Sequence, residues 1–367
     1  MHHKLLFVGD IVLETEPVLS TELQEIFAKN VIRSCNVEAP LRGKGQAIEK
    51  TGPLLNQRPD AARLLQTMDF NLFVMANNHI FDYGEEAMFH TISSLGKEET
   101  IGAGDKEQAY RLLVRTIDNI RYGFLAYGES GYGALDGKST LGYAWVNHPR
   151  VNSDIAAYRA TVDMLIVQVH AGVEMIDVPI PEWRDRYREL IDCGADIVIG
   201  HHPHIVQGVE YYKSKPIFYS LGNFYFDGIA NTSIWNTGAI LQLEVKDGQL
   251  SEFDFHLVEK SGQKLVLKPQ NESKEILEKR SEMMSNESEY LEYINKVAVQ
   301  EWQKHHSNYY AKAFNGLSSY TFRSLLKHVK RLIFNRKIDY NIMWHNLAIE
   351  SNLWIVRRAI ERLHRQK

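Results

Sequence analysis

The chain has 367 residues, of which 44% are hydrophobic and 24% are charged, and it contains two cysteines. This composition excludes a disordered, fibrous or disulfide-stapled protein, and the length suits one large domain with an appendage. The net charge of −4 is unevenly spread. Residues 312–367 hold twelve Lys and Arg against three acidic residues, a balance of +9, so the preceding chain carries −13.

The chain begins with a short apolar run. Leu5–Val8 is followed at once by Gly9 and Asp10, and the acidic residue ends the run too early for a signal peptide. No later stretch approaches the roughly 20 apolar residues of a membrane-spanning helix. We therefore predict a cytoplasmic protein, with a membrane-peripheral location as the alternative.

Short apolar runs, each followed by turn or polar residues, recur through the first 225 residues. We predict buried strands at 5–8, 72–76, 124–127, 164–169, 196–199 and 216–219. Helical patterns separate several of them, most clearly at 84–95 and 181–193. A hairpin is predicted at 239–258, where an Asp247-Gly248 turn joins two apolar runs. This alternation predicts an α/β layered fold.

After Pro269 the strand signals nearly vanish. The segments 273–284, 287–305, 320–334 and 341–364 have helix-compatible patterns. We predict a first domain at 1–265 and a basic α-helical region at 266–367. The basic residues gather in one part of that region: Lys327, Lys330, Arg331, Arg336 and Lys337. Such helices favour contact with a membrane surface, a protein or an acidic polymer, or packing as a helical cap. No nucleic-acid module is recognisable.

Polar side chains follow nearly every predicted strand. They are Asp10, Asn36, Glu38, Asn77, Asn78, His79, His170, His201, His202 and His204. In open α/β sheets ligands bind beyond the carboxyl ends of the strands, so these side chains are expected to converge on one crevice. Carboxylates together with several imidazoles are typical ligands of a divalent transition metal. The three histidines within residues 201–204 are the strongest single signal, since a buried strand rarely needs them for packing.

The motifs, taken in order, resemble those of the CapA family. They are Gly9-Asp10, Asn36-Val37-Glu38, Asn77-Asn78-His79 with Asp82-Tyr83-Gly84, His170-Ala171-Gly172-Val173-Glu174, Gly200-His201-His202-Pro203-His204 and Tyr219-Ser220-Leu221-Gly222-Asn223-Phe224. The resemblance covers about residues 4–258. It implies a role in poly-γ-glutamate capsule synthesis and a four-layer α/β/β/α sandwich of the calcineurin-like metallophosphoesterase type, followed here by the C-terminal α-helical appendage.

The resemblance also implies a role for each matching residue. Asp10 and His204 would hold a first metal ion, and Glu38 would bridge to a second ion held by Asn78, His170 and His202. His79 would be the general acid, oriented by Asp82. The remaining motif residues would line the substrate pocket: Asn36, Glu174, His201 and Asn223. The cofactor would be one or two divalent ions, with Mn, Fe or Zn favoured over Mg.

One position departs from the superfamily pattern. The first aspartate is usually followed two residues later by a histidine, and this chain has Val12 there. The first ion therefore has fewer ligands, unless Glu14, His201 or water completes its shell. A typical family member also begins with a membrane anchor, which this sequence does not display.

Two functions fit these features. The first is a metal-dependent hydrolase that cleaves a phosphoester or a γ-glutamyl amide in an anionic small molecule or polymer. The second is a non-catalytic metal-binding accessory protein of a polymer-synthesis assembly. The pair His79 and Asp82 favours the enzyme, because a binding module needs no proton donor. The absence of a histidine at position 12 favours the accessory protein.

Overall fold

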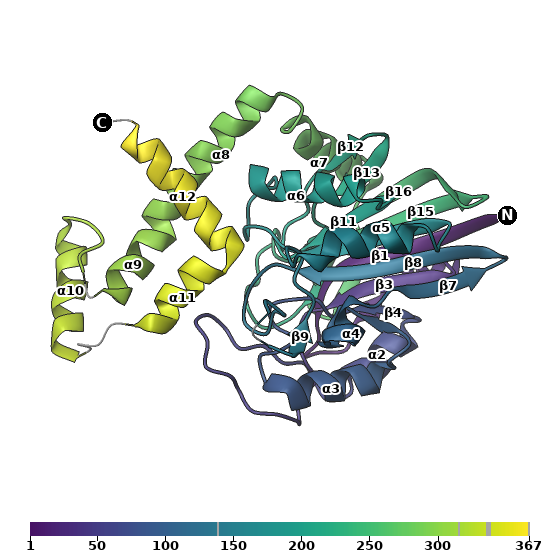
Figure 1. Ribbon diagram of the computed structural model, residues 1–367, viewed down its shortest axis with the longest axis horizontal. Coiled ribbons are helices and arrows are strands. Elements are labelled where there is room, and N and C mark those ends of the chain that lie inside the picture. The colour runs from purple at the N-terminus through teal and green to yellow at the C-terminus, as the bar shows by residue number, and fades with distance from the viewer. Residues whose placement is uncertain (138, 315, 335–338, 366–367) are drawn as a thin grey trace. The chain divides into compact units, whose positions relative to one another are not determined.

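The computed structural model describes residues 1–137, 139–314, 316–334 and 339–365 (Figure 1). The chain divides into two compact units. The first comprises residues 1–48 and 54–284, and the second comprises residues 49–53 and 285–367. The boundary predicted at 265/266 falls within strand β17 (Lys264–Leu267), and helix α7 (Gln270–Glu282), which follows this strand, still belongs to the first unit.

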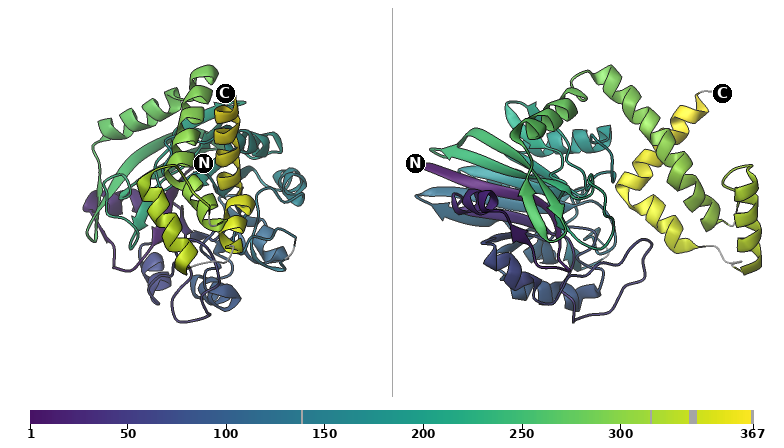
Figure 2. Two further views of the ribbon diagram at one scale, coloured as in Figure 1. Left: turned by 90° about the vertical axis from the view of Figure 1, so that its left-hand side faces the viewer. Right: turned by 180° about the vertical axis from the view of Figure 1, so that it is seen from behind.

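A nine-stranded mixed sheet contains the N-terminal strand β1 (His2–Val12) at its centre. β1 runs parallel to β3 and β14 and antiparallel to β15, and Figure 2 shows β1 (purple) beside the long strands β15 and β16 (green). The other strands of this sheet are β2 (Val18–Leu19), β3 (Ile32–Val37), β4 (Leu72–Val74), β5 (Thr100–Ile101), β14 (Asn223–Phe226), β15 (Thr237–Lys246), β16 (Gln249–Ser261) and β17 (Lys264–Leu267).

A six-stranded sheet has a parallel centre and antiparallel edges. Its order is β12 (Val209–Tyr212), β13 (Lys215–Phe218), β11 (Ile197–His201), β10 (Met164–His170), β8 (Ile120–Gly128) and β7 (Leu113–Ile117). The apolar residues of β10 are buried on both faces of the strand, as expected for a parallel strand covered on both sides. A third, two-stranded sheet joins β6 (Ala103–Asp105) to β9 (Leu141–Tyr143).

Helices cover the sheets of the first unit. α5 packs on β10, and α6 packs on β11 and β13. α6 begins with Pro181 in its first turn and is followed by Gly194 at a φ of 126°, the start and stop signals seen in the sequence. The helices of this unit are α1 (Thr21–Ala28), α2 (Ala61–Thr67), α3 (Gly84–Leu95), α4 (Lys106–Tyr110), α5 (Arg150–Arg159), α6 (Pro181–Asp192) and α7.

The two large sheets share one hydrophobic core. Phe7 of β1 belongs to the same buried cluster as Phe124 of β8, Ile166 of β10 and Ile199 of β11. Each of the six predicted strands and both predicted helices of the first 225 residues has its counterpart in the structure. The prediction of a mixed α/β fold is thus confirmed.

Residues 219–223 cross from the six-stranded sheet to the nine-stranded sheet and approach both very closely. The amide of Asp10 donates to the carbonyl of Gly222 at 2.9 Å, and the amide of Leu221 donates to the carbonyl of Gly200 at 3.1 Å. A Cβ atom on Gly9 or on Gly200 would lie 1.9 Å from a carbonyl oxygen of this segment. Glycine before Asp10 and before His201 is therefore required by the backbone that crosses between the sheets.

The second unit is helical. α12 (Glu350–His364) packs on α8 (Glu287–Glu301), and α11 (Tyr340–Ala348) packs on α9 (Ser307–Ala313). A π-helical turn, η1 (Trp302–His306), joins α8 to α9, and α10 spans Phe322–Phe334. Arg336 and Lys337 of the predicted basic cluster lie outside the described residues.

The helix-compatible segment 341–364 forms two helices, because the chain breaks between α11 and α12. Ile349 adopts an extended backbone with a ψ of 119°. The side chain of Asn352 donates to the carbonyl of His345 at 3.3 Å, which satisfies a carbonyl at the end of α11. Among the described residues, no helix has both the length and the apolar character needed to cross a bilayer.

Candidate metal centre

The strands bring the predicted site residues to one place. Asp10 lies near the end of β1, and Asn36 is the second-last residue of β3. His170 and His201 are the final residues of β10 and β11. All four side chains are fully buried. The carboxyl ends of parallel strands from both sheets therefore meet at a single polar cluster inside the hydrophobic core.

Asp10 is held by hydrogen bonds from several neighbours. Its Oδ1 accepts from the side-chain amide of Asn36 at 2.7 Å, and its Oδ2 accepts from the backbone amide of His202 at 3.2 Å. Burial would raise the pKa of this carboxyl, but the neighbouring imidazoles of His201 and His204 hold the pKa well below its usual range. Asp10 is therefore an ionised carboxylate at neutral pH.

Glu38 is the most unusual side chain of the cluster. It is fully buried, and within the described part of the chain neither of its carboxylate oxygens has a hydrogen-bond partner. Its Oε1 lies 3.4 Å from Nε2 of His204 and 3.7 Å from Nε2 of His170. Burial raises the pKa of Glu38 well above its usual range, more than His204 lowers it. A buried carboxylate without hydrogen bonds is costly, and a bound cation is the partner such a group requires.

His170 and His202 pack against each other beside Glu38. Nδ1 of His202 lies 3.0 Å from Nε2 of His170, which is also 2.9 Å from Oδ1 of Asn78. Burial lowers the pKa of His202 to about 4 and puts the pKa of His170 well below its usual range. Both imidazoles are therefore neutral at neutral pH, which is the form that binds a metal.

His204 behaves differently from the other two histidines. Burial lowers its pKa, but the carboxylates of Glu38 and Asp10 outweigh burial and raise the pKa to about 10. Its Nδ1 lies 2.9 Å from Oδ1 of Asn223, whose side-chain amide donates to the carbonyl of Trp235 at 2.9 Å. Asn223 orients the ring so that Nε2 faces Glu38. The two carboxylates thus create a negative field that attracts positive charge to this point.

The backbone of the His202-Pro203-His204 motif is strained. His202 has a φ of 92° and His204 a φ of 54°, which is the left-handed region that side chains with a Cβ rarely adopt. The carbonyl of Pro203 accepts from the amide of Met175 at 2.9 Å, which helps to hold the loop. Strain of this kind persists where the surroundings fix it and is concentrated at functional sites.

Among the residues that the structure describes, two sets of His, Asp and Glu side chains have ligand atoms that all lie within 4.8 Å of one another. They are Glu38 with His202 and His204, and Asp10 with Glu38 and His170. Glu38 is common to both sets, which is the position that the family resemblance implies for a bridging ligand. The grouping by distance pairs His204 with His202 and Asp10 with His170, whereas the resemblance implied other pairs, so the allocation of ligands between ions stays a prediction.

The His79–Asp82 pair stands beside this cluster. Nδ1 of His79 donates to Oδ2 of Asp82 at 2.7 Å, and both side chains are nearly or fully buried. Oδ1 of Asn77 accepts from the amide of Ile80 at 2.9 Å, and Nδ2 of Asn77 donates to the carbonyl of Val37 at 2.9 Å. Asn77 thereby shapes the turn that carries His79. The contact with Asp82 fixes the ring orientation and leaves Nε2 as the nitrogen that exchanges a proton.

Val12 lies in a small apolar cluster with Ala39, Phe226 and Trp235. The ring centroid of Trp235 is 4.7 Å from that of His204, so aromatic packing occupies the surroundings of position 12. Glu14, one candidate for completing the ligand shell, pairs with Arg42 at the surface instead.

His201 and Glu174 take contrasting positions. Nδ1 of His201 is buried, has no hydrogen bond and lies 3.5 Å from Oδ1 of Asp10. Its other ring nitrogen lies 3.3 Å from Gln168. Glu14 and His201 were the two side chains predicted to complete the ligand shell of the first ion. Of these, His201 is therefore the one that lies close to Asp10. Glu174 is exposed, yet its charge acts on Glu38, His202 and His204.

Glu129 is a residue of the cluster that the sequence analysis missed. It is 2% exposed, and its Oε1 lies 3.3 Å from Nε2 of His202. A carboxylate beside this nitrogen would favour a proton on Nε2 of His202 and leave Nδ1 for a metal. The signal was present, because Glu129 follows the apolar run 124–127 just as the other site residues follow theirs.

We expect Glu129→Gln to weaken metal binding by about 10- to 100-fold, the usual effect of losing an outer partner of a ligating histidine. Titration of Mn²⁺ into metal-stripped protein, followed by calorimetry, measures the affinity. Glu275→Gln, the same change at an exposed residue of α7, is the matched control. Equal affinities for the two variants would contradict the role given to Glu129.

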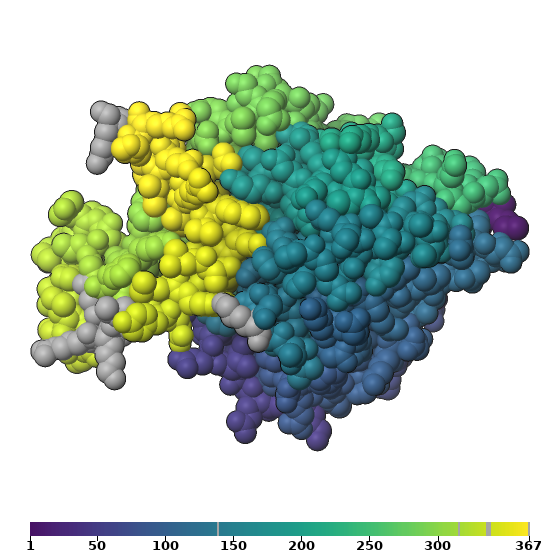
Figure 3. Space-filling view, in the orientation of Figure 1, coloured from purple at the N-terminus to yellow at the C-terminus, as the bar shows by residue number. Residues whose placement is uncertain are grey.

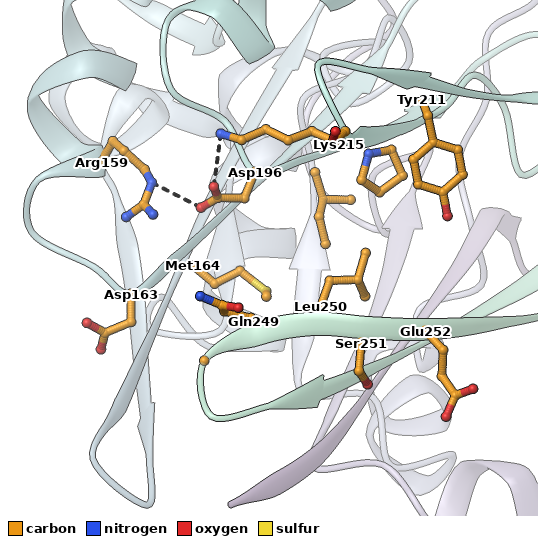
Figure 4. A pocket seen from close by; sticks show the side chains of 14 residues that line it. Arg159, Asp163, Met164, Asp196, Tyr211, Lys215, Gln249, Leu250, Ser251 and Glu252 are labelled. Atoms are coloured by element: carbon orange, nitrogen blue, oxygen red, sulfur yellow. Dashed lines mark ion pairs between the residues drawn. The ribbon is translucent and has the colours of Figure 1, made fainter.

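A pocket of about 420 Å³ lies elsewhere in the first unit (Figure 4). Met164 and Ile197, the first residues of β10 and β11, line it, so it lies at the opposite end of the six-stranded sheet from the metal centre. Three of its charged groups pair with one another, since Asp196 is 3.1 Å from Arg159 and 3.0 Å from Lys215. None of the predicted site residues lines this pocket.

Comparison with known proteins identifies the family. The model of the bacterial capsule synthesis protein PGA_cap family matches residues 4–228, and the chain belongs to this family. The matched residues include every predicted metal ligand as well as His79 and Asp82. The predicted family resemblance is thus confirmed.

Two curated relatives and one solved structure are similar to the chain. The PGA biosynthesis protein CapA of Bacillus subtilis is 30% identical over 206 residues, which are 54% of this chain and 53% of the relative. The capsule biosynthesis protein CapA of Bacillus anthracis is 28% identical over 209 residues, 54% of this chain and 50% of the relative. The chain thus spans about half the length of these relatives. A putative 5'-nucleotidase from Staphylococcus aureus has a TM-score of 0.45 at 12% identity, covering 77% of this chain and 59% of that one.

Proposed function

We propose that the chain is a metal-dependent hydrolase that cleaves a phosphoester or a γ-glutamyl amide bond. The observation that carries the proposal is Glu38, a fully buried carboxylate without hydrogen bonds that lies 3.4 Å from His204 and 3.7 Å from His170. A protein that needed these side chains only for packing would satisfy the carboxylate or replace it with an apolar residue.

The residues that would hold the metal are Asp10, Glu38, Asn78, His170, His202 and His204, with His201 as a further candidate. Three or more imidazoles among the ligands favour Mn, Fe or Zn over Mg, which prefers oxygen. A bound divalent ion, or a pair of them, supplies a water of lowered pKa and stabilises the charge that develops on the substrate. Asp10 and Glu38 offset the positive charge within the buried site.

His79 and Asp82 would carry the proton transfer. Asp82 accepts from Nδ1 of His79 at 2.7 Å, which stabilises the protonated ring and directs Nε2 away from Asp82. A protonated imidazole in this position can donate to the departing oxygen or nitrogen of the substrate. This role distinguishes His79 from the ligand histidines, which need their lone pairs for the metal.

The biological setting is proposed from the family. The relatives named above are capsule and PGA biosynthesis proteins, so we propose that the substrate is an anionic polymer, or a small anionic molecule, of capsule metabolism. We also propose that the first unit is the catalytic domain, and that its two sheets and flanking helices form the four-layer α/β/β/α sandwich of the metallophosphoesterases.

A second candidate is a non-catalytic metal-binding accessory protein of a polymer-synthesis assembly. Val12 favours it, because the superfamily histidine at this position is replaced by apolar packing against Phe226 and Trp235. An accessory protein would bind metal through the same ligands but would not depend on His79.

Hydrolysis assays distinguish the two candidates. Purified protein loaded with Mn²⁺ is assayed on an aryl phosphomonoester, an aryl phosphodiester and a γ-glutamyl anilide. The hydrolase proposal expects turnover of at least one substrate class that a chelator abolishes and added Mn²⁺ restores. Metal binding at full stoichiometry with no turnover on any of the three would favour the accessory protein.

A further inference from the structure

Helix α10 (Phe322–Phe334) exposes its apolar face, whereas an amphipathic helix of a globular protein ordinarily buries that face. The apolar residues of α10 are all exposed. Phe334 ends the helix away from the others, which recur at the spacing of one helix face: Phe322, Leu325, Leu326, Val329, Leu332 and Ile333. Exposure reaches 75% at Phe322 and 62% at Ile333. The buried residue of α10 is Ser324, whose position in the helical period is on the other side. The lime spheres of Figure 3 include α10.

Positive charge flanks this apolar stripe. α10 contains Arg323, Lys327, Lys330 and Arg331 and no acidic residue. None of the four pairs with a carboxylate in the part of the chain that the structure describes. Arg331 donates to the carbonyl of Gly316, and the other three extend into solvent. The helix therefore combines an exposed apolar stripe with uncompensated cations on one side of it.

We propose that α10 binds the surface of an anionic lipid bilayer, with its apolar stripe among the acyl chains and its cations at the headgroups. Helices with this division of residues lie in the plane of the membrane interface. Thirteen residues span about 20 Å, which is too short to cross a hydrocarbon core of about 30 Å. A second copy of the helix would cover the stripe but would bring like charges together. A nucleic acid would engage the cations but leave the stripe in water.

Vesicle binding tests the proposal with the full chain. The protein is mixed with phosphatidylcholine vesicles that contain or lack phosphatidylglycerol, and the bound fraction is measured by co-sedimentation. We expect binding to the anionic vesicles, little binding to the neutral ones, and weaker binding as salt is added, because the headgroup attraction is screened.

Two variants separate the contributions of α10. Leu326→Ser shortens the apolar stripe, and the double variant Lys327→Glu with Lys330→Glu reverses two flanking charges. Each is expected to lower the vesicle partition coefficient by about tenfold or more. The controls make the same changes elsewhere: Leu347→Ser at an exposed leucine of α11, and the double variant Lys274→Glu with Lys279→Glu at two exposed lysines of α7. Circular dichroism confirms that each variant is folded.

Three results would overturn the proposal. The first is the absence of wild-type binding to anionic vesicles. The second is binding that the α10 variants and the control variants affect equally. The third is a wild-type dimer, detected by analytical ultracentrifugation, that Leu326→Ser dissociates, since the stripe would then be covered by a second copy. Because the proposal concerns the second unit alone, it does not depend on the activity proposed for the first.

Discussion

Glu38→Gln is expected to remove most of the metal from the purified protein. Glu38 belongs to both groups of ligand atoms, so its loss affects every ion that the centre holds. Glutamine has nearly the same size but carries no charge and binds cations weakly. Loss of an outer partner costs about 10- to 100-fold in affinity, and loss of this shared ligand is expected to cost about 100-fold or more. Elemental analysis and Mn²⁺ titration give the stoichiometry and the affinity.

Glu244→Gln is the matched control for Glu38. Glu244 is also a nearly buried glutamate of the nine-stranded sheet, but it pairs with Lys4 and His2 away from the centre. Its replacement is expected to leave the metal content unchanged. If Glu38→Gln kept the metal stoichiometry and affinity of the wild type, the ligand assignment would be wrong.

His79→Ala is expected to lower kcat by roughly 100- to 10,000-fold while leaving bound metal unchanged. General acid catalysis contributes about this much, and the leaving group would depart without a proton when the imidazole is absent. The loss is expected to be smaller on an aryl ester with an acidic leaving group, which needs little protonation. Comparing substrates with leaving groups of different pKa measures this dependence directly.

Two further variants define the role of His79. Asp82→Asn keeps the shape of the pair but removes the charge that stabilises the protonated ring, so a smaller loss of kcat is expected. His90→Ala removes a half-buried histidine of α3 outside the centre and is expected to leave kcat unchanged. Equal activity of His79→Ala and wild type across all leaving groups would exclude His79 as the acid and favour the accessory function.

Much of the fold and of the site follows from local sequence signals. The apolar runs ending in Asp10, His170 and His201 predicted both the strands and the polar residues at their ends, because side chains at the carboxyl ends of neighbouring strands must meet. The contact between His79 and Asp82 is also local, since the two residues are three positions apart in one turn. These features require no knowledge of how the sheets pack.

Other features depend on tertiary packing and could not be predicted. The distance between Glu38 and His204 is set by the approach of two sheets whose shared core joins residues more than a hundred positions apart. The packing of Trp235 on His204 comes from a segment without a strand or helix pattern. The break at Ile349 was missed because the apolar period continues through it. Glu129, by contrast, could have been predicted, because it follows a predicted strand just as the other polar residues of the site do.

The segment 219–223 also limits how the metal centre can move. Its backbone forms a hydrogen bond with Asp10 of the nine-stranded sheet and another with Gly200 of the six-stranded sheet, next to His201. Ligands from separate sheets thus form a single rigid block, and neither sheet can slide without carrying ligands of both. The amide of Asp10 is therefore expected to exchange with solvent only in openings that part the two sheets. A centre fixed in this way is expected to keep the distances between its ligand side chains whether or not a metal is bound.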